Sequence, residues 1–284
     1  MDSKDLRIFH TVAIEKNITR AAEVLGYVQS NVTARIRQLE KEVSTPLFYR
    51  SKKGMILTQA GENLFGYSEK ILHLLDEALK SVQYTENPSG PLTIGALETT
   101  AAVHMPKLLR NYLQKYPEVK LSLVTGHTGD LVQKVLDYEI DGAFVSGKVD
   151  HPDMEQVLVF EEELVLISEN TDEKLKEILK KPMLLLSVGC SMRNRLEQWL
   201  EEEDMETNNI MEFGTLEAIL GGASAGLGVS MLPKSAVKGR EEQGLIRVYT
   251  IPEAYRNYQV YFVFRKDFFQ TRAFERFLEH ITCD

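Results

Sequence analysis

The stretch that decides the fold of the N-terminal region runs from Asn17-Ile-Thr-Arg-Ala-Ala-Glu-Val-Leu25 through Gly26 to Gln29-Ser-Asn-Val-Thr-Ala-Arg-Ile-Arg-Gln-Leu-Glu-Lys-Glu-Val43. We expect a short helix that opens at Thr19 and ends before Gly26, because glycine readily adopts the left-handed conformation that closes a helix. A second helix is predicted over 29–43, since apolar residues recur there at three- and four-residue steps: Val32, Ile36, Leu39 and Val43. Two short helices separated by a glycine turn are typical of a helix-turn-helix.

The segments on either side extend this unit. Residues 4–15 have the spacing of an amphipathic helix, with one apolar face made of Leu6, Phe9, Val12 and Ala13. After the second helix, Pro46-Leu-Phe48 and Met55-Ile-Leu-Thr58 flank the basic, glycine-containing Arg50-Ser-Lys-Lys-Gly54. That arrangement predicts a small β-hairpin with a basic tip, a wing. Residues 1–60 are therefore predicted to form a winged helix-turn-helix domain.

The predicted second helix carries polar side chains on the faces that its apolar stripe leaves free. We expect this helix and the wing to contact DNA through Gln29, Ser30, Asn31, Thr33, Arg35, Arg37, Gln38, Arg50, Lys52 and Lys53. The first residues of a recognition helix meet base edges in the major groove, where Gln and Asn can bind adenine. Arginine and lysine supply phosphate contacts, or minor-groove contacts from the wing. The alternative is a solvated polar face, but the first helix, the turn and the wing together favour double-stranded DNA as a partner.

The net charge of the whole chain is −9, which taken alone argues against a nucleic-acid partner. The charge is unevenly distributed, however. Residues 1–60 contain ten Lys or Arg and six Asp or Glu, a balance of +4, whereas the remaining residues balance at −13. A small basic unit attached to a larger acidic one is compatible with DNA binding by the basic unit alone.

A long proline-free helical pattern begins after Thr58, a residue suited to cap a helix, and continues to about Tyr84. Its core positions alternate four- and three-residue steps, as in a coiled coil with one polar position: Leu64, Ser68, Ile71, Leu75, Ala78 and Val82. We interpret residues 58–90 as a dimerising linker helix followed by a hinge around Asn87-Pro-Ser-Gly-Pro91. The alternative is a helix that packs only on its own domain.

Beyond Pro91 the pattern changes to alternating strands and helices. Strands are predicted at 92–97, 119–125, 141–146, 163–168, 183–188, 229–232 and 259–265, and helices at 100–116, 128–138, 192–203, 215–225 and 270–281. Such alternation is typical of an α/β fold with parallel sheets covered by helices on both faces. Two clusters of elements divide residues 91–284 into a first lobe of about 91–161 with 267–284 and a second lobe of about 162–266. Ligands of open α/β sheets bind at the carboxyl ends of strands, so a cleft between the lobes would hold a small molecule.

Several ordered motifs make essentially the whole chain resemble the LysR-type transcriptional regulators. They are Asn17–Leu25, Gln29–Thr33, Arg37–Glu40, Pro46–Phe48, Arg50, Leu57–Gly61, Phe144–Val145, Gly189–Arg193, Phe213–Glu217 and Ala225–Pro233. The resemblance implies a winged helix-turn-helix, a linker helix and a two-subdomain effector domain like the periplasmic binding proteins. It also implies homodimers that assemble into homotetramers, bend promoter DNA and act on RNA polymerase indirectly. Two residues depart from the family pattern, because Val28 stands where a Ser or Thr cap is usual and Ser44 replaces the usual turn glycine.

The resemblance places the effector site at the strand ends and helix starts of the two lobes. The residues it implies are Thr99, Thr100, His127, Thr128, Val145, Ser146, Cys190, Ser191 and Arg193. Hydroxyls and free N–H groups at helix N-termini bind anions well, so a small anionic metabolite such as a carboxylate is the expected effector. Alternatively, Thr100, Thr128 and Ser191 are plain N-caps, and Arg193 pairs with a neighbouring glutamate. A further alternative makes Cys190 an oxidant sensor, because a helix N-terminus lowers a thiol pKa.

The remaining motifs argue against other kinds of site. The six histidines have no metal-ligand spacing, and the two cysteines, Cys190 and Cys283, cannot build a four-cysteine zinc site. The glycine-rich segment 221–228 lacks the Lys-Ser/Thr of a phosphate-binding loop, and no Gly-x-Ser-x-Gly supports a hydrolase. We therefore expect no metal, no cofactor and no enzymatic activity.

Two other classes of protein are alternatives to a transcription factor. A small-molecule binding protein or enzyme whose first 60 residues only contact other proteins would not need the polar helix face and the basic wing. A membrane protein is not expected, since no apolar run approaches the length of a transmembrane helix. The N-terminus also lacks the apolar core of a signal peptide, so a cytoplasmic protein is predicted.

Overall fold

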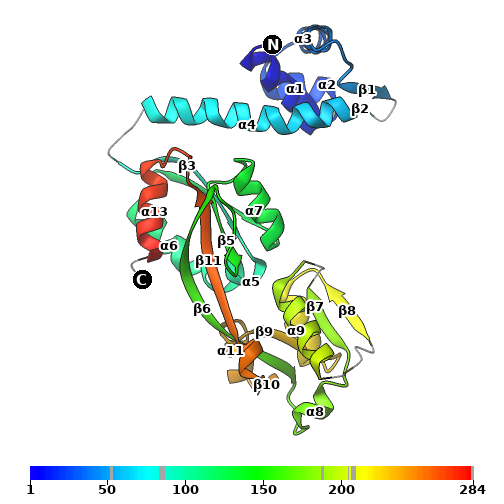
Figure 1. Ribbon diagram of the computed structural model, residues 1–284, viewed down its shortest axis with the longest axis vertical. Coiled ribbons are helices and arrows are strands. Elements are labelled where there is room, and N and C mark those ends of the chain that lie inside the picture. Colours follow the sequence, from blue (N-terminus) through cyan, green and yellow to red (C-terminus); the bar gives the residue numbers. More distant parts are fainter. Residues whose placement is uncertain (52–53, 83–86, 187–188, 204, 206–208, 283–284) are drawn as a thin grey trace. The chain divides into compact units, whose positions relative to one another are not determined.

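The computed structural model describes residues 1–51, 54–82, 87–186, 189–203, 205 and 209–282. The chain divides into two compact units, one comprising residues 1–84 with 137–139 and the other comprising 85–136 with 140–284. Figure 1 shows the helices and strands of each unit, coloured along the sequence. Within the described residues, no helix is both long enough and apolar enough to cross a membrane.

The N-terminal unit is a helical domain with a small hairpin. Its elements are α1 (Ser3–Glu15), α2 (Ile18–Leu25), α3 (Gln29–Glu42), β1 (Phe48–Ser51), β2 (Gly54–Leu57) and α4 (Gln59–Val82). The apolar stripes of the first three helices meet in one core, in which Phe9, Val12 and Ile36 are fully buried. Burying each such side chain contributes about 1.5–3 kcal/mol, so this cluster stabilises the unit. The predicted winged helix-turn-helix is therefore confirmed.

Local hydrogen bonds explain where the first helices begin and end. Asp2 and Asp5 form a reciprocal capping box at the start of α1. The Asn17 side chain accepts a hydrogen bond from the backbone N–H of Thr19 (2.8 Å), so α2 begins one residue before Thr19. Gly26 ends α2 with a φ of 68°, the left-handed conformation that was expected of this glycine.

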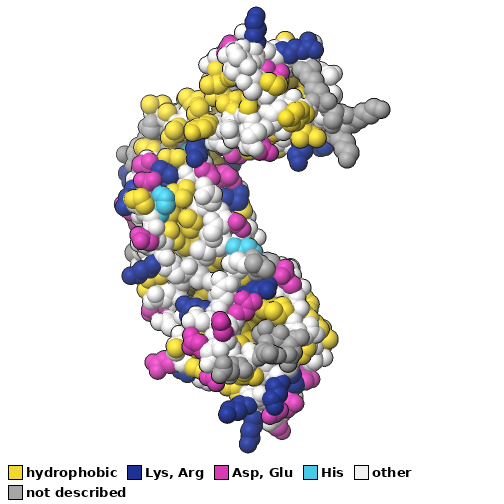
Figure 2. Space-filling view, turned by 45° about the vertical axis from the view of Figure 1, so that its right-hand side comes forward, with side chains coloured by type: hydrophobic (Ala, Val, Ile, Leu, Met, Phe, Trp, Pro, Cys, Tyr) yellow, Lys and Arg dark blue, Asp and Glu magenta, His cyan; other side chains and the backbone are white. Residues whose placement is uncertain are grey.

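The long helix α4 begins where the sequence predicts it. The Thr58 hydroxyl accepts a hydrogen bond from the Gly61 N–H (3.0 Å) and donates one to the Pro46 carbonyl (2.8 Å). Ser68, the polar position of the predicted seam, is fully buried and donates to the carbonyl of Phe65. The predicted helix end at Tyr84 lies outside the described residues. Large apolar side chains are exposed along α4, namely Tyr67, Leu74, Leu75, Leu79 and Val82, and Figure 2 shows hydrophobic side chains gathered over its C-terminal half.

The contact between α1 and α4 includes His10, whose protonation affects the stability of the folded unit. The His10 ring stacks on Phe65, with ring centroids 4.9 Å apart and ring planes 2° apart. Burial lowers the pKa of His10 below its usual 6.5, and the charge of Arg7 adds to this effect, although Glu69 lies 3.6 Å from Nε2. Because the folded state resists protonation, the stability that this residue contributes is present above pH 6.5 and is lost as the pH falls through the lowered pKa.

We therefore expect the unfolding free energy of this unit to decline as the pH is lowered from about 7.5 to about 5. Urea unfolding across that range measures the decline. The His10→Phe variant keeps an aromatic ring against Phe65 but cannot be protonated, so its decline should be smaller. An equally steep decline in the variant would contradict the assignment to His10.

The second unit is built on a seven-stranded sheet. The strands follow the order β10 (Ile246–Thr250), β6 (Met154–Glu169), β11 (Asn257–Arg265), β5 (Gly142–Ser146), β3 (Gly90–Ala96) and β4 (Val119–Thr125), and β9 (Ser230–Pro233) also pairs with β6. β3 is parallel to β4 and β5, whereas β6 and β11 are antiparallel to all their partners. The expectation of purely parallel sheets is therefore wrong. The reason is that β6 and β11, the two longest strands, cross between the lobes in opposite directions (Figure 1).

A two-stranded parallel sheet of β7 (Met183–Leu186) and β8 (Ile210–Phe213) completes the second lobe. The helices of this unit are α5 (Glu98–Val103), α6 (Met105–Lys115), α7 (Thr128–Leu136), α8 (Leu175–Ile178), α9 (Ser191–Glu202), α10 (Leu216–Ser224), α11 (Lys234–Glu242), α12 (Glu253–Arg256) and α13 (Arg272–Thr282). The single helix predicted over 100–116 is in fact two helices that meet at His104. β8, β10 and α11 were not predicted, and the strand predicted at 163–168 is only the last part of β6.

Candidate functional site

The first candidate site is the outward face of α3. Val32, Ile36 and Leu39 are buried in the domain core, which turns the other faces of this helix to solvent. Of the predicted DNA-contacting residues on α3, Thr33 is half-buried and the others are exposed: Gln29, Ser30, Asn31, Arg35, Arg37 and Gln38. The structure thus brings the predicted polar residues of α3 onto one accessible surface.

Two of these exposed side chains already have partners within the domain. Arg35 Nη1 lies 3.2 Å from Oδ1 of Asp5, whose carboxylate is buried, so Arg35 links α3 to α1. Gln38 Nε2 donates a hydrogen bond to Glu42 Oε1 (3.3 Å). Arg37, in contrast, has no partner among the residues that the structure describes. Of the two α3 arginines, Arg37 is therefore the one whose full charge is available to a phosphate.

β1 and β2 form the predicted wing, an antiparallel hairpin that is anchored at the end of α1. The Met55 N–H donates a hydrogen bond to the Lys16 carbonyl (2.8 Å). Gly54 has a φ of 114°, and a Cβ there would lie 2.3 Å from the same carbonyl oxygen, so only glycine fits. Of the predicted wing contacts, Lys52 and Lys53 lie outside the described residues, and the side chain of Arg50 is not described either.

The two departures from the family pattern have visible backbone consequences. Val28 is the N-cap of α3, is exposed, and makes no side-chain hydrogen bond to the first turn. Ser44 has a φ of 54°, the left-handed region that a glycine adopts without strain. The recognition helix therefore begins without the side-chain cap that a Ser or Thr would supply.

The second candidate site is a cavity of about 190 Å³ where strand ends and helix starts of the two lobes meet. It is lined by Leu97, Glu98, Thr99, Thr125, Gly126, His127, Leu186, Cys190, Ser191, Met192, Gly214 and Tyr258. Four predicted effector residues belong to this lining: Thr99, His127, Cys190 and Ser191. Five others do not line it among the described residues: Thr100, Thr128, Val145, Ser146 and Arg193.

Four of those five residues lie in α5, α7 and β5. Thr100 and Val145 are buried, at 3% and 0% exposure, in α5 and β5. The Thr128 hydroxyl accepts a hydrogen bond from the Ser146 N–H (3.1 Å), which ties the start of α7 to the end of β5.

The starts of α5 and α9 do not support the alternative in which Thr100 and Ser191 are N-caps. Leu97 and Cys190 occupy the N-cap positions of α5 and α9, and neither makes a side-chain cap hydrogen bond. Thr100 and Ser191 are therefore inside their helices, and the interpretation of these two residues as N-caps is wrong.

Tyr258 lies at the junction of the two lobes and was not predicted as a site residue. Its hydroxyl is 3.0 Å from Ser191 Oγ, which connects β11 to the start of α9. Burial raises the pKa of Tyr258, while its hydrogen bonds to Ser146 and Ser191 act in the opposite direction. The phenol therefore stays neutral and acts as a polar link beside the cavity.

Comparison with known proteins identifies the family of both domains. Residues 3–62 match the bacterial regulatory helix-turn-helix proteins of the lysR family, and residues 85–283 match the LysR substrate binding domain. The chain is 50% identical to the uncharacterized HTH-type transcriptional regulator YusT of Bacillus subtilis, over 99% of this chain and 96% of that protein. This chain belongs to the LysR family. It is a LysR-type transcriptional regulator with a helix-turn-helix DNA-binding domain and an effector-binding domain, not an enzyme.

Solved structures share the fold of this LysR-type regulator. Full-length OxyR from Pseudomonas aeruginosa, a cysteine-to-aspartate variant, matches with a TM-score of 0.76 and 26% identity over 99% of this chain and 94% of that chain. Full-length CbnR complexed with its target DNA matches with a TM-score of 0.73 and 23% identity over 100% of this chain and 99% of that chain. The second likeness supports the fold alone.

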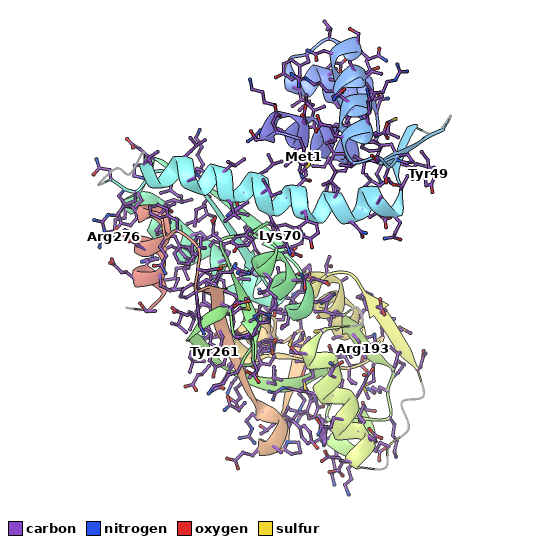
Figure 3. All side chains as sticks on the ribbon, turned by 45° about the horizontal axis from the view of Figure 1, so that its top comes forward. Met1, Tyr49, Lys70, Arg193, Tyr261 and Arg276 are labelled. Atoms are coloured by element: carbon purple, nitrogen blue, oxygen red, sulfur yellow. The ribbon has the colours of Figure 1, made fainter. Side chains whose placement is uncertain are left out.

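In this LysR-type regulator Arg193 follows the alternative interpretation, a pair with neighbouring glutamates. Its Nε lies 2.9 Å from Glu197 Oε1, and its Nη1 lies 3.2 Å from Glu212 Oε2. Figure 3 labels Arg193 on α9, where its side chain is 14% exposed. The guanidinium is thus paired with two carboxylates, and Arg193 is not among the described residues that line the cavity.

Cys190 lines the cavity, but its thiol is not activated. Burial raises its pKa, and this outweighs the lowering by the backbone N–H groups of Met192 and Arg193 at the start of α9. The expectation of a lowered pKa is therefore wrong. Oxidants react with the thiolate, so burial disfavours the reactive form of this thiol. Cys283 lies outside the described residues.

Most of the other residues that line the cavity were not predicted from the sequence. Gly126 belongs to the segment 126–128 that the family resemblance implies, whereas Glu98 was not predicted although it directly precedes the predicted Thr99. Gly214 lies in the family motif Phe213–Glu217 but was not assigned to the site, and Tyr258 directly precedes the strand predicted at 259–265.

Proposed function

We propose that this LysR-type regulator binds promoter DNA sequence-specifically through α3 and the wing, under the control of a small molecule in the cavity between the lobes. The observation that carries the proposal is the exposed polar face of α3 opposite its buried stripe of Val32, Ile36 and Leu39. Gln29 and Asn31 lie in the first turn, the end that recognition helices present to base edges. The proposed contacts are Gln29, Ser30, Asn31, Thr33, Arg35, Arg37, Gln38, Arg50, Lys52 and Lys53.

We further propose that α4 joins two copies of the chain. Leu74, Leu79 and Val82 are 47%, 56% and 80% exposed in the single chain, and a second helix packed along them would remove that apolar surface from water. A dimer also presents two basic N-terminal units to one duplex. Residues 1–60, 58–90 and 91–284 then act as DNA-binding domain, dimerising linker and effector domain, with homotetramers acting on RNA polymerase indirectly.

The effector that we propose carries a carboxylate. Thr99 and Ser191 place hydroxyl groups in the lining from opposite lobes, and the N-terminus of α9, a helix of 12 residues, opens at Ser191. Hydroxyl and backbone donors of this kind bind anions. A molecule that touches both lobes stabilises one lobe arrangement over another, which is how its binding would change the geometry of bound DNA.

The DNA part of the proposal is tested by measuring the affinity of the full chain for genomic promoter fragments over a range of salt concentrations. The logarithm of the affinity should fall linearly with the logarithm of the salt concentration, by about 0.9 per phosphate contact. Gln29→Ala should lower the ratio of specific to random-sequence affinity by roughly 5- to 100-fold. Lys52→Ala combined with Lys53→Ala should weaken binding to all sequences alike.

The matched control is Gln198→Ala, the same substitution at an exposed position of α9 in the effector domain. It should change neither the salt dependence nor the specificity ratio. Binding that is independent of salt, or a Gln29→Ala variant with the specificity of the parent, would overturn the proposed recognition face.

A further inference from the structure

The charges of the effector cavity are unusual for a site that takes only an anion. Among its described lining residues the ionisable groups are Glu98, His127, Cys190 and Tyr258, and none is a lysine or arginine. Burial raises the pKa values of Cys190 and Tyr258, so both are neutral. Glu98 is the one aspartate or glutamate among the described lining residues.

That carboxylate is held in place across the two lobes. Glu98 Oε1 accepts a hydrogen bond from the backbone N–H of Leu216 (2.7 Å), the first residue of α10. Glu98 itself begins α5 in the first lobe. Within the described part of the chain, no donor contacts the second carboxylate oxygen. The group is thus positioned by one oxygen and has hydrogen-bonding capacity left on the other.

The two arginines of α9, Arg193 and Arg195, are engaged with other groups. Arg193 is paired with Glu197 and Glu212. Arg195 donates a hydrogen bond to the Asn257 carbonyl (2.6 Å), and its guanidinium lies 5.8 Å from the centre of the Tyr258 ring. A ligand with negative groups only would place them beside Glu98 with no lysine or arginine in the described lining to balance it, whereas a ligand with a cationic group gains a charged hydrogen bond to Glu98.

The same cavity contains donors for a carboxylate. Thr99 is 3% exposed, lines the cavity, and has no hydrogen-bond partner among the described residues. With no partner among the described residues, the Thr99 hydroxyl can donate a hydrogen bond to a ligand in the cavity. Ser191 adds a second hydroxyl from the other lobe. The cavity volume of about 190 Å³ is suited to a small metabolite.

We propose that the effector is a small zwitterion of the α-amino-acid type, whose ammonium group binds Glu98 and whose carboxylate binds Thr99, Ser191 and the start of α9. This inference rests on the proposed function of the cavity as the effector site. It makes Glu98 the residue that selects an amino acid over the acid of the same skeleton without the amine. Because Glu98 already contacts Leu216 of the second lobe, the ammonium binds where the two lobes are joined.

The test is a thermal-shift and calorimetric comparison on the full chain with matched probes. The twenty common L-amino acids are screened, and three of them are paired with their amine-free acids: alanine with propionate, valine with isovalerate and aspartate with succinate. At least one amino acid should raise the Tm of the parent protein, and its amine-free acid should bind at least roughly tenfold more weakly, as expected for a lost charged contact. If no amino acid raises the Tm, the proposal is overturned.

Two variants separate selection by Glu98 from a merely structural role. Glu98→Gln keeps an oxygen for the Leu216 N–H but loses the charge, so the preference for the amino acid over the amine-free acid should vanish or reverse. Thr99→Val should weaken both ligands alike. A Glu98→Gln variant with a lower Tm but an unchanged preference would overturn the proposal.

The outcomes also distinguish this inference from the function on which it rests. If an amine-free acid binds more tightly than every amino acid, and Thr99→Val weakens it, the cavity is an effector site but the ligand is not a zwitterion. If the bound amino acid is insensitive to both Glu98→Gln and Thr99→Val, the ligand occupies another place, and both the inference and the proposed effector site are wrong.

Discussion

The Gly61→Ala variant is expected to lose about 3 kcal/mol of unfolding free energy in the N-terminal unit. Gly61 is buried in the first turn of α4, where a Cβ would lie 2.2 Å from the Leu47 carbonyl oxygen and 2.9 Å from Cδ2 of Leu57. The Leu47 carbonyl is held in place, because it also accepts a hydrogen bond from the Thr58 N–H (3.0 Å). The added methyl therefore forces α4 away from the base of the wing and disrupts the Thr58 cap.

Gly66→Ala is the matched control, since Gly66 lies on the same helix and no atom lies within 4 Å of the position of its Cβ. Alanine is favoured over glycine in a helix by about 0.5–1 kcal/mol, so this variant should be more stable than the parent. Urea unfolding of the full chain, followed by far-ultraviolet circular dichroism at one fixed protein concentration, measures both. If the two alanines have the same effect, the approach of α4 to Leu47 is looser than the structure has it.

The Glu40→Ala variant is expected to lose about 2–4 kcal/mol of unfolding free energy and to bind DNA more weakly. Glu40 Oε1 accepts hydrogen bonds from the backbone N–H groups of Leu47 (2.9 Å) and Phe48 (3.2 Å). These donors lie where the chain turns from α3 into β1. Removing the carboxylate leaves both N–H groups without that acceptor at the base of the wing, so the wing is no longer held in register with α3.

Glu40→Gln separates the hydrogen bonds from the charge. The amide keeps an oxygen that can accept from both backbone donors, so this variant should lose less than half as much stability as Glu40→Ala. Urea unfolding gives the stability of each variant, and a gel shift with a promoter fragment gives its DNA affinity. Equal losses in the two variants would mean that the charge of Glu40, and not its role as an acceptor, stabilises the wing.

The N-terminal domain could be predicted almost residue by residue, because its signals are local. Val32, Ile36 and Leu39 follow the period of a helix, and Gly26 marks a turn that a left-handed residue must make. The resemblance to the LysR family also pointed to Leu57–Gly61. The reason for the glycine in that motif is a close approach of α4 to Leu47, which no periodicity contains.

The sheet of the effector domain was predicted less well. β6 extends over 16 residues, but Glu161, Glu162 and Glu163 interrupt its apolar pattern, so only its last part was recognised. Its direction relative to β11 depends on pairings such as Val263 with Gln156, which join distant parts of the chain. Alternation of strands and helices suggests parallel neighbours and does not reveal such crossings.

By itself, the sequence determined the class of protein: a winged helix-turn-helix, a long linker helix and an α/β effector domain. It did so because helix periods, caps and turns depend on residues within a few positions of each other. Only the tertiary structure decided the chemistry of the cavity, including the pairing of Arg193 and the place of Glu98. Glu98 and its partner Leu216 are 118 residues apart in the sequence. Their hydrogen bond depends on how the lobes pack, which local sequence patterns do not predict.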